Sequence, residues 1–348
     1  MSITSKSPRK VALEALAVAG QTLPTYWHRF SPKVFTVGQL FACLVLKAFF
    51  KTDYRGVVAI LADLPDLTQG LGLQRVPHFT TLQKNATRLL DFAPANQLLQ
   101  TTVQRHFGKG GAIDVAAADS TGMESSQVSP YFVRRKSRGH DRSNPLYQTT
   151  TYTQFPKIHV ACDCATHLVL SAMPCLGPTP DVDRFRPLLW LTLASVAVGT
   201  FLADAGYDSE PNHAFAREGC RVRSVMPALH GRPCKDPNKP LSGKYRDLMR
   251  RFRDFRYGQR WQIESVFSMI KRRLGPVVLG RSQRTRSAEM MLKVLTHNIM
   301  IRVVFLLEVF YRAGRESLMG RTRCRPRGRR VDCNSNFSAV RSCHWSSP

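Results

Sequence analysis

Two aspartates follow apolar runs that read as buried β-strands, and they are the first candidates for chemistry. Asp119 ends the run Val115-Ala-Ala-Ala-Asp119, and Asp204 ends the run Phe201-Leu-Ala-Asp204. A carboxylate directly after a buried strand is costly unless it is paired or binds a metal. A turn or a helix cap explains either aspartate alone better, but two of them on adjacent strands favour a shared catalytic or metal site.

A third carboxylate, Glu264, lies in a segment with helical periodicity. At 100° per residue, four polar side chains fall within an arc of about 60°: Tyr257, Arg260, Glu264 and Lys271. The opposite side carries four apolar residues: Ile263, Val266, Met269 and Ile270. The apolar face can pack on a sheet while the polar stripe faces a ligand. The alternative is a solvated face with an Arg260–Glu264 ion pair, worth only a few tenths of a kcal/mol.

The spacing Tyr-x2-Arg-x3-Glu-x6-Lys resembles the signature of the DDE transposases of bacterial insertion sequences. The segments Ala118-Asp119-Ser-Thr-Gly and Asp204-Ala-Gly-Tyr-Asp208 resemble the settings of the family's two aspartates, and the likeness spans roughly residues 75–305. The resemblance implies an RNase H-like α/β catalytic domain, a mixed sheet flanked by helices. It also implies that Asp119, Asp204 and Glu264 are the catalytic, metal-binding triad.

The resemblance further implies metal-dependent nicking at transposon ends and transfer of the 3′-hydroxyl into target DNA. Three convergent carboxylates suit two Mg2+ ions, and Mn2+ can substitute. The expected partners are terminal inverted repeats and target DNA, with a homodimer in a synaptic complex and no membrane. Two readings stay open beside transposition: a metal-dependent DNA nuclease without strand transfer, and an inactive DNA-binding remnant of a transposase.

Several other side chains are expected to contact DNA. Arg260 and Lys271 are candidates to clamp phosphates, and Tyr257 to hydrogen-bond one. Trp261 either stacks on an unpaired base or belongs to the core. A basic segment after the first aspartate adds three further candidates: Arg134, Arg135 and Lys136.

Four residues near these motifs have weaker assignments. Asp114 should point to the opposite side of its strand from Asp119, because the two are an odd number of residues apart. Asp163 ends a strand and could approach the metals. Asp181 precedes a helix and reads as a cap, and Lys157 starts a strand beside the expected site and could contact DNA.

The order of expected elements is that of an RNase H-like fold. Strands at 112–119, 158–164 and 167–173 precede a helix at 182–194, followed by further strands and helices in alternation. Two long helices, at about 255–274 and 288–312, end the domain. We therefore expect an all-α N-terminal region (1–110), a catalytic domain (111–312) and a basic disordered tail (313–348). The N-terminal region either binds DNA or caps the catalytic domain.

Charge and composition agree with a nucleic-acid partner. The 348 residues carry a net charge of +27, and the regions 1–110, 111–311 and 312–348 carry +8, +12 and +7. The body itself is therefore basic, as expected for a protein that follows a phosphate backbone. The longest apolar run, 187–203, is shorter than the ~20 residues of a membrane span. Nine cysteines without framework spacing, and no signal peptide, favour a cytoplasmic protein, bacterial and nucleoid-associated by the resemblance.

Overall fold

The computed structural model describes residues 3–125, 154–228, 243–250 and 255–322. By its internal contacts the chain divides into two units, residues 1–305 and 306–348. The candidate residues Arg134, Arg135 and Lys136 lie outside the described residues. All contacts reported below belong to the first unit.

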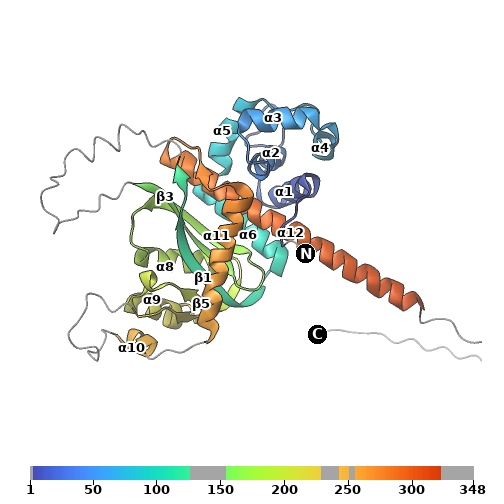
Figure 1. The fold of residues 1–348 in the computed structure, drawn as a ribbon. Coiled ribbons are helices and arrows are strands. Elements are labelled where there is room, and N and C mark those ends of the chain that lie inside the picture. The colour runs from blue at the N-terminus through green and yellow to red at the C-terminus, as the bar shows by residue number, and fades with distance from the viewer. Residues whose placement is uncertain (1–2, 126–153, 229–242, 251–254, 323–348) are drawn as a thin grey trace, which may run out of the picture. The chain divides into compact units, whose positions relative to one another are not determined.

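Short helices make up the N-terminal region, as predicted (Figure 1). They are α1 (Pro8–Thr22), α2 (Val37–Phe49), α3 (Tyr54–Asp63), α4 (Pro65–Gly70), α5 (Phe79–Leu89) and α6 (Phe92–Phe107). Thr36 begins α2 with a capping box, in which its hydroxyl accepts from Gln39 N–H and the Gln39 side chain accepts from Thr36 N–H. His78 caps α5, and its ring accepts from Thr80 N–H.

A five-stranded mixed sheet forms the centre of the catalytic domain. Its strands are β1 (Ala112–Gly122), β3 (Phe155–Asp163), β4 (Val169–Gly177), β5 (Ala197–Ala203) and β6 (Arg223–Val225), in the order β4-β3-β1-β5-β6. Strand β3 pairs antiparallel with both β1 and β4, whereas β5 pairs parallel with β1 and with β6. This order confirms the predicted RNase H-like fold. A two-stranded sheet joins β2 (Glu124–Ser125) to β7 (Val277–Val278).

The remaining elements are helices that connect or cover the strands. They are η1 (Val182–Arg184), α8 (Phe185–Leu193), η2 (Ala205–Tyr207), α9 (Glu210–Ala214), η3 (Phe215–Gly219), α10 (Lys244–Arg250), η4 (Phe255–Trp261), α11 (Gln262–Leu274) and α12 (Gln283–Thr322). The N–H groups of Tyr245 and Arg246 in the first turn of α10 donate to the Glu210 carboxylate. One prediction is wrong here: residues 313–322, expected in a disordered tail, continue α12.

The alternation of side chains along β1 assigns its two faces to different helices. Val115 and Ala117 pack with apolar residues of α11 and α12, whereas Ala116 and Ala118 pack with α8. Figure 1 shows α11 crossing one face of the sheet and α8 lying against the other. Because successive strand residues point to opposite faces, Asp119 lies on the α11 face and Ser120 on the α8 face.

The helical region and the catalytic domain share one hydrophobic core, which runs from α1 and α2 to α11 and α12. Within it, Glu14 of α1 accepts hydrogen bonds from Arg302 Nε (2.7 Å) and Arg105 Nε (3.1 Å). These contacts are those of a helical cap packed on the domain; DNA binding by the region stays a prediction. By length and hydropathy the segment Gln283–Val309 of α12 could cross a membrane, but 78% of its most apolar window is buried, as in a core helix.

Candidate active site

The register of two parallel strands brings the two aspartates together. Ala118 of β1 pairs with Ala203 of β5, so Asp119 and Asp204 are the next residues on adjacent strands. Both follow the face that carries Ala117 and Leu202, the face covered by α11. Asp119 is 20% exposed and Asp204 is exposed, so both carboxylates can be reached by a ligand.

Arg260 links the first aspartate to the glutamate. Its Nη1 donates to Asp119 Oδ2 at 2.9 Å, and its Nη2 donates to Glu264 Oε1 at 3.1 Å. The prediction of one continuous α-helix through Tyr257 and Glu264 is wrong, because residues 255–261 form the tighter 3-10 helix η4 and α11 begins only at Gln262. The predicted Arg260–Glu264 pair is present. The solvated-face alternative does not include the second bond of Arg260, to Asp119. This bond ties η4, directly before α11, to β1.

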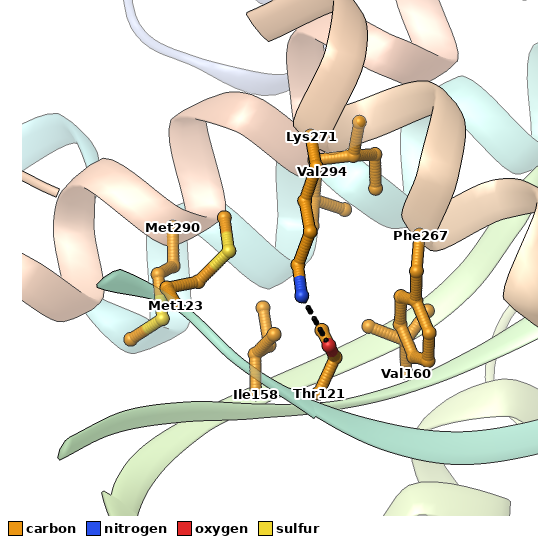
Figure 2. Close-up of a pocket in the computed structure, with 9 residues that line it drawn as sticks. Thr121, Met123, Ile158, Val160, Phe267, Lys271, Met290 and Val294 are labelled. Atoms are coloured by element: carbon orange, nitrogen blue, oxygen red, sulfur yellow. Dashed lines mark hydrogen bonds between the residues drawn. The ribbon is translucent and has the colours of Figure 1, made fainter. Parts of the chain in front are cut away.

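Lys271 lies two turns beyond Glu264 and also faces β1. Its Nζ donates to Thr121 Oγ1 at 2.8 Å, two residues beyond Asp119 (Figure 2). Figure 2 shows the side chain reaching from α11 toward the strand, beside Phe267 and Ile158. The apolar stem is thus held by the pocket while the ammonium binds the Thr121 hydroxyl.

The charges of the site influence one another. Burial is the main cause that raises the pKa of Asp119; Ser120 N–H and Arg260 lower it, and the nearby carboxylates of Asp204 and Asp181 raise it further. Burial alone would lower the pKa of Arg260, but Tyr257 and the surrounding carboxylates raise it. Burial also raises the pKa of Tyr257. A cation therefore relieves a cluster of negative charge here, and Arg260 supplies that cation in this structure.

Residues 110–299 match the family model described as "Transposase DDE domain". The chain belongs to the DDE transposases. Three solved structures are similar: a Mos1 transposase paired-end complex with left transposon end, the Mos1 mariner paired-end complex with Mn, and a pre-cleavage Mos1 transpososome. Their identities are 10%, 11% and 9%, with TM-scores of 0.19, 0.19 and 0.20.

The three matches differ in extent. They cover 50%, 61% and 85% of this chain and 58%, 65% and 98% of the respective Mos1 chains, so the chain spans little more than half of the first. No curated protein sequence matches the chain. The assignment of the fold therefore rests on the strand order of this DDE transposase itself.

The carboxylates of this DDE transposase fit a divalent cation by their chemistry. Asp119, Asp204 and Glu264 offer hard oxygen donors, which Mg2+ and Mn2+ prefer. Among the described residues, no three acidic, histidine or cysteine side chains converge closely enough to hold an ion. Arg260 lies between Asp119 and Glu264 instead. The donor set is present, and the guanidinium stands where the charge of a metal would be needed.

The structure also places the weaker candidates. Trp261 is 57% exposed, so the core interpretation is wrong and the ring is open to a partner. Asp114 is 77% exposed, and its carboxylate lies 3.5 Å from Arg256 of η4; that it faces away from the site stays a prediction. The suggestion that Asp163 approaches the metals is wrong. It pairs with Ala116, three residues before Asp119, and its carboxylate accepts hydrogen bonds from Thr166 that close the turn to β4.

Sequence reasoning missed the contacts of Asp181. Expected as a helix cap, it makes no cap hydrogen bond. Its carboxylate accepts instead from the Ser120 hydroxyl and from the Lys157 ammonium, so Lys157 is also engaged within the protein. The alternation Asp119/Ser120 indicates that Ser120 faces the other side of the sheet. No signal in the sequence says that a residue 61 positions later meets it there.

Proposed function

We propose that this protein is a DNA transposase that nicks transposon ends and joins the freed 3′-hydroxyl to target DNA. One observation carries the proposal: within the family's domain, Asp119 and Asp204 directly follow the last pair of the parallel strands β1 and β5, and Arg260 ties Glu264 to Asp119. The substrate class is duplex DNA with inverted repeats at the transposon ends. Assembly as a homodimer that holds two ends, in the cytoplasm beside the nucleoid, is part of the same proposal.

In this proposal Asp119, Asp204 and Glu264 hold divalent cations, Mg2+ or Mn2+. Bound there, two such ions would stabilise the attacking and leaving oxygens of an in-line phosphoryl displacement. The other side chains bind and orient DNA. Arg260 can exchange its carboxylate partners for a phosphate, to which a guanidinium binds bidentately. Lys271 presents a second cation at Thr121, two residues beyond Asp119, and the exposed ring of Trp261 offers a stacking surface.

A basic hollow at the end of α11 supports DNA as the partner. Its volume is about 460 Å³, and four basic side chains from three separate segments line it: Lys6, Lys51, Arg272 and Arg273. The other lining residues are Ser5, Phe49 and Met300, so none of the residues that line it is acidic. At 1.5 Å per residue, Arg272 lies roughly 12 Å along α11 from Glu264, about the length of three to four base pairs. DNA that follows α11 away from the carboxylates would reach this hollow.

The test is a cleavage and joining assay with the full chain, duplex DNA that carries the sequences flanking the gene, and Mg2+ or Mn2+. We expect 3′-end nicking followed by joining, lost by at least about 1,000-fold in Asp119→Ala, Asp204→Ala and Glu264→Ala, since metal stabilisation supplies several kcal/mol. DNA binding should survive in all three variants. Nicking without joining would indicate a nuclease. Binding without cleavage would indicate an inactive remnant, and activity that survives Glu264→Ala would refute the triad.

A further inference from the structure

A polar cluster lies on the α8 face of the sheet, directly opposite the carboxylates. Ser120 of β1 pairs with His159 of β3, and both point to this face, as does Lys157 two residues before His159. Tyr207, from the loop after Asp204, reaches the same place, and its hydroxyl lies 2.9 Å from His159 Nδ1. His159 and Tyr207 are fully buried, whereas Lys157 and Asp181 at the edge of the cluster are 13% and 22% exposed.

Asp181 joins the members of this cluster. Its Oδ2 accepts a hydrogen bond from Ser120 Oγ at 3.1 Å, and its Oδ1 accepts one from Lys157 Nζ. Lys157 Nζ also donates to the carbonyl of Thr179, which fixes the ammonium from a second side. Both carboxylate oxygens are therefore engaged within the protein. Buried polar networks of this kind fix a geometry because a lost partner leaves an unsatisfied group.

The same carboxylate touches the loop that carries the second aspartate. A Cβ added to Gly206 would lie 3.5 Å from Asp181 Oδ2, so the loop packs directly against this oxygen. Gly206 is two residues after Asp204, and Ser120 is one residue after Asp119. A single side chain thus contacts both segments that carry the aspartates.

The contacts exclude the simpler roles of Asp181. As a helix cap it would accept a backbone N–H of the following turn, and it accepts none. As a metal ligand it would need a free oxygen on the α11 face, but both oxygens are bonded on the opposite face. A DNA contact through Lys157 would first have to break that residue's bonds to Asp181 and Thr179.

We propose that Asp181 is a positioning residue that holds the ends of β1 and β5 so that Asp119 and Asp204 stay aligned for metal binding. The inference rests on the proposed function, because it assumes that these carboxylates bind a cation. Residues that orient metal ligands from behind typically change metal affinity by 10- to 100-fold when they are removed.

The experiment measures Mn2+ binding to the full chain without DNA by titration calorimetry, together with urea unfolding. Asp181→Ala should weaken Mn2+ binding at least tenfold. Asp181→Asn, which keeps one acceptor oxygen, should fall between this variant and the wild type. Asp183→Ala is the matched control: it removes an exposed carboxylate from the same short helix and should bind Mn2+ like the wild type. Affinity lost only in proportion to lost folded protein would overturn the positioning role.

A double-mutant cycle with Ser120→Ala gives the sharper test, and Asp181→Asn takes the place of Asp181→Ala in the cycle if Asp181→Ala folds poorly. If Asp181 acts through Ser120, the double variant should bind Mn2+ no more weakly than the weaker single variant. Additive losses would overturn the inference, and so would unchanged affinity in Ser120→Ala. A wild-type chain that binds no Mn2+ would overturn the proposed function and this inference together. Binding that depends on Asp119 but not on Asp181 would overturn only the inference.

Discussion

Two charge clusters in this protein have the same pattern with opposite signs. At the site, one guanidinium, Arg260, lies between two carboxylates, Asp119 and Glu264. In the core between α1, α6 and α12, one carboxylate, Glu14, lies between two guanidiniums, those of Arg105 and Arg302. Their exposure differs. Glu14 and Arg302 are 6% and 2% exposed, whereas Arg260 and Glu264 are 22% and 61% exposed.

The difference indicates what each cluster can do. A buried ion pair cannot exchange its partners without leaving an uncompensated buried charge, so the loss of one partner is strongly destabilising. Pairs that water can reach are worth only ~0.2–1 kcal/mol each and can be replaced by another ligand. The Glu14 cluster is therefore structural, and the Arg260 cluster is a site that is open to exchange.

The largest expected effect is on stability at the buried cluster. Glu14→Gln leaves two guanidiniums without their counter-charge and should lower the free energy of unfolding by about 3–5 kcal/mol. Asp119→Asn removes a carboxylate of raised pKa at the open cluster and should leave the urea midpoint unchanged or higher. Urea unfolding of both variants checks this. If Asp119→Asn destabilised the protein as much as Glu14→Gln, the comparison would fail.

A second expected effect is that a buried histidine makes the stability of the core depend on pH. Burial is the main cause that lowers the pKa of His297, on α12, to about 4. Its Nε2 lies 3.1 Å from the carbonyl of His167. At pH 7 the group is neutral in both states and adds nothing. As the pH falls from about 6.5 to about 4, only the unfolded chain takes up the proton, so stability is lost at about 1.4 kcal/mol per pH unit, roughly 3 kcal/mol in all.

His297→Gln should remove this loss. Unfolding curves at half-unit pH steps should show a shallower fall of stability between pH 6.5 and 4 than the wild type shows. Between pH 7 and 8 the difference between variant and wild type should not change with pH. An equal slope in both proteins below pH 6.5 would mean that the His297 ring is not held neutral by burial.

A third expected effect is on the salt dependence of DNA binding, which tests whether the basic side chains of the hollow contact DNA. Lys6→Gln with Arg272→Gln removes two cations of the basic hollow, and each phosphate contact contributes about 0.9 to the salt slope of DNA binding. The slope for a 40-base-pair duplex should fall by about 1.8, which is roughly a 30-fold loss of affinity at 0.15 M salt.

The matched control loses two charges at the other end of the sheet. Lys109 and Arg221 are exposed and precede the parallel strands β1 and β6, whereas the site lies beyond the carboxyl ends of β1 and β5. Lys109→Gln with Arg221→Gln should leave the salt slope within about 0.5 of the wild type. Equal losses of salt slope in both double variants would mean that the hollow attracts DNA only through its contribution to the net charge of the protein.

The sequence predicted those parts of the site that depend on local patterns. Asp119 and Asp204 each follow an apolar run that predicts a buried strand, and the pairing of the two strands as neighbours brings them together, so both could be predicted as members of one site. The predicted end of the first strand at Asp119 was too early, because β1 continues to Gly122. Glu264 and Lys271 lie on one helical stretch, and both face the site side of the domain, as the period of 3.6 requires. The predicted helical positions of Tyr257 and Arg260 were less accurate, because the hydrophobic period cannot distinguish a segment that begins as a 3-10 helix from a continuous α-helix.

The contacts that could not be predicted join residues far apart in the chain. Glu14 meets Arg105 and Arg302 across 91 and 288 residues, and Asp181 meets Ser120 across 61. A side chain of either kind reads as a solvated charge or a cap until the packing of the helices is known. Tertiary packing, not propensity, decides which carboxylates are buried with a partner and which remain open.

The smallest expected effect is also the most specific for the open cluster. A cation that binds Asp119 and Glu264 has to displace Arg260, and two partly exposed ion pairs cost at most about 2 kcal/mol to break. Arg260→Gln should therefore tighten Mn2+ binding without DNA by at most about 30-fold, while DNA cleavage falls because a phosphate ligand is lost. Calorimetry and the cleavage assay measure the two effects separately.

Asp181→Ala should shift Mn2+ affinity in the opposite direction, so the two variants distinguish a residue that occupies the metal position from one that shapes it. Weaker Mn2+ binding in Arg260→Gln would mean that the guanidinium aligns the carboxylates instead of competing for them.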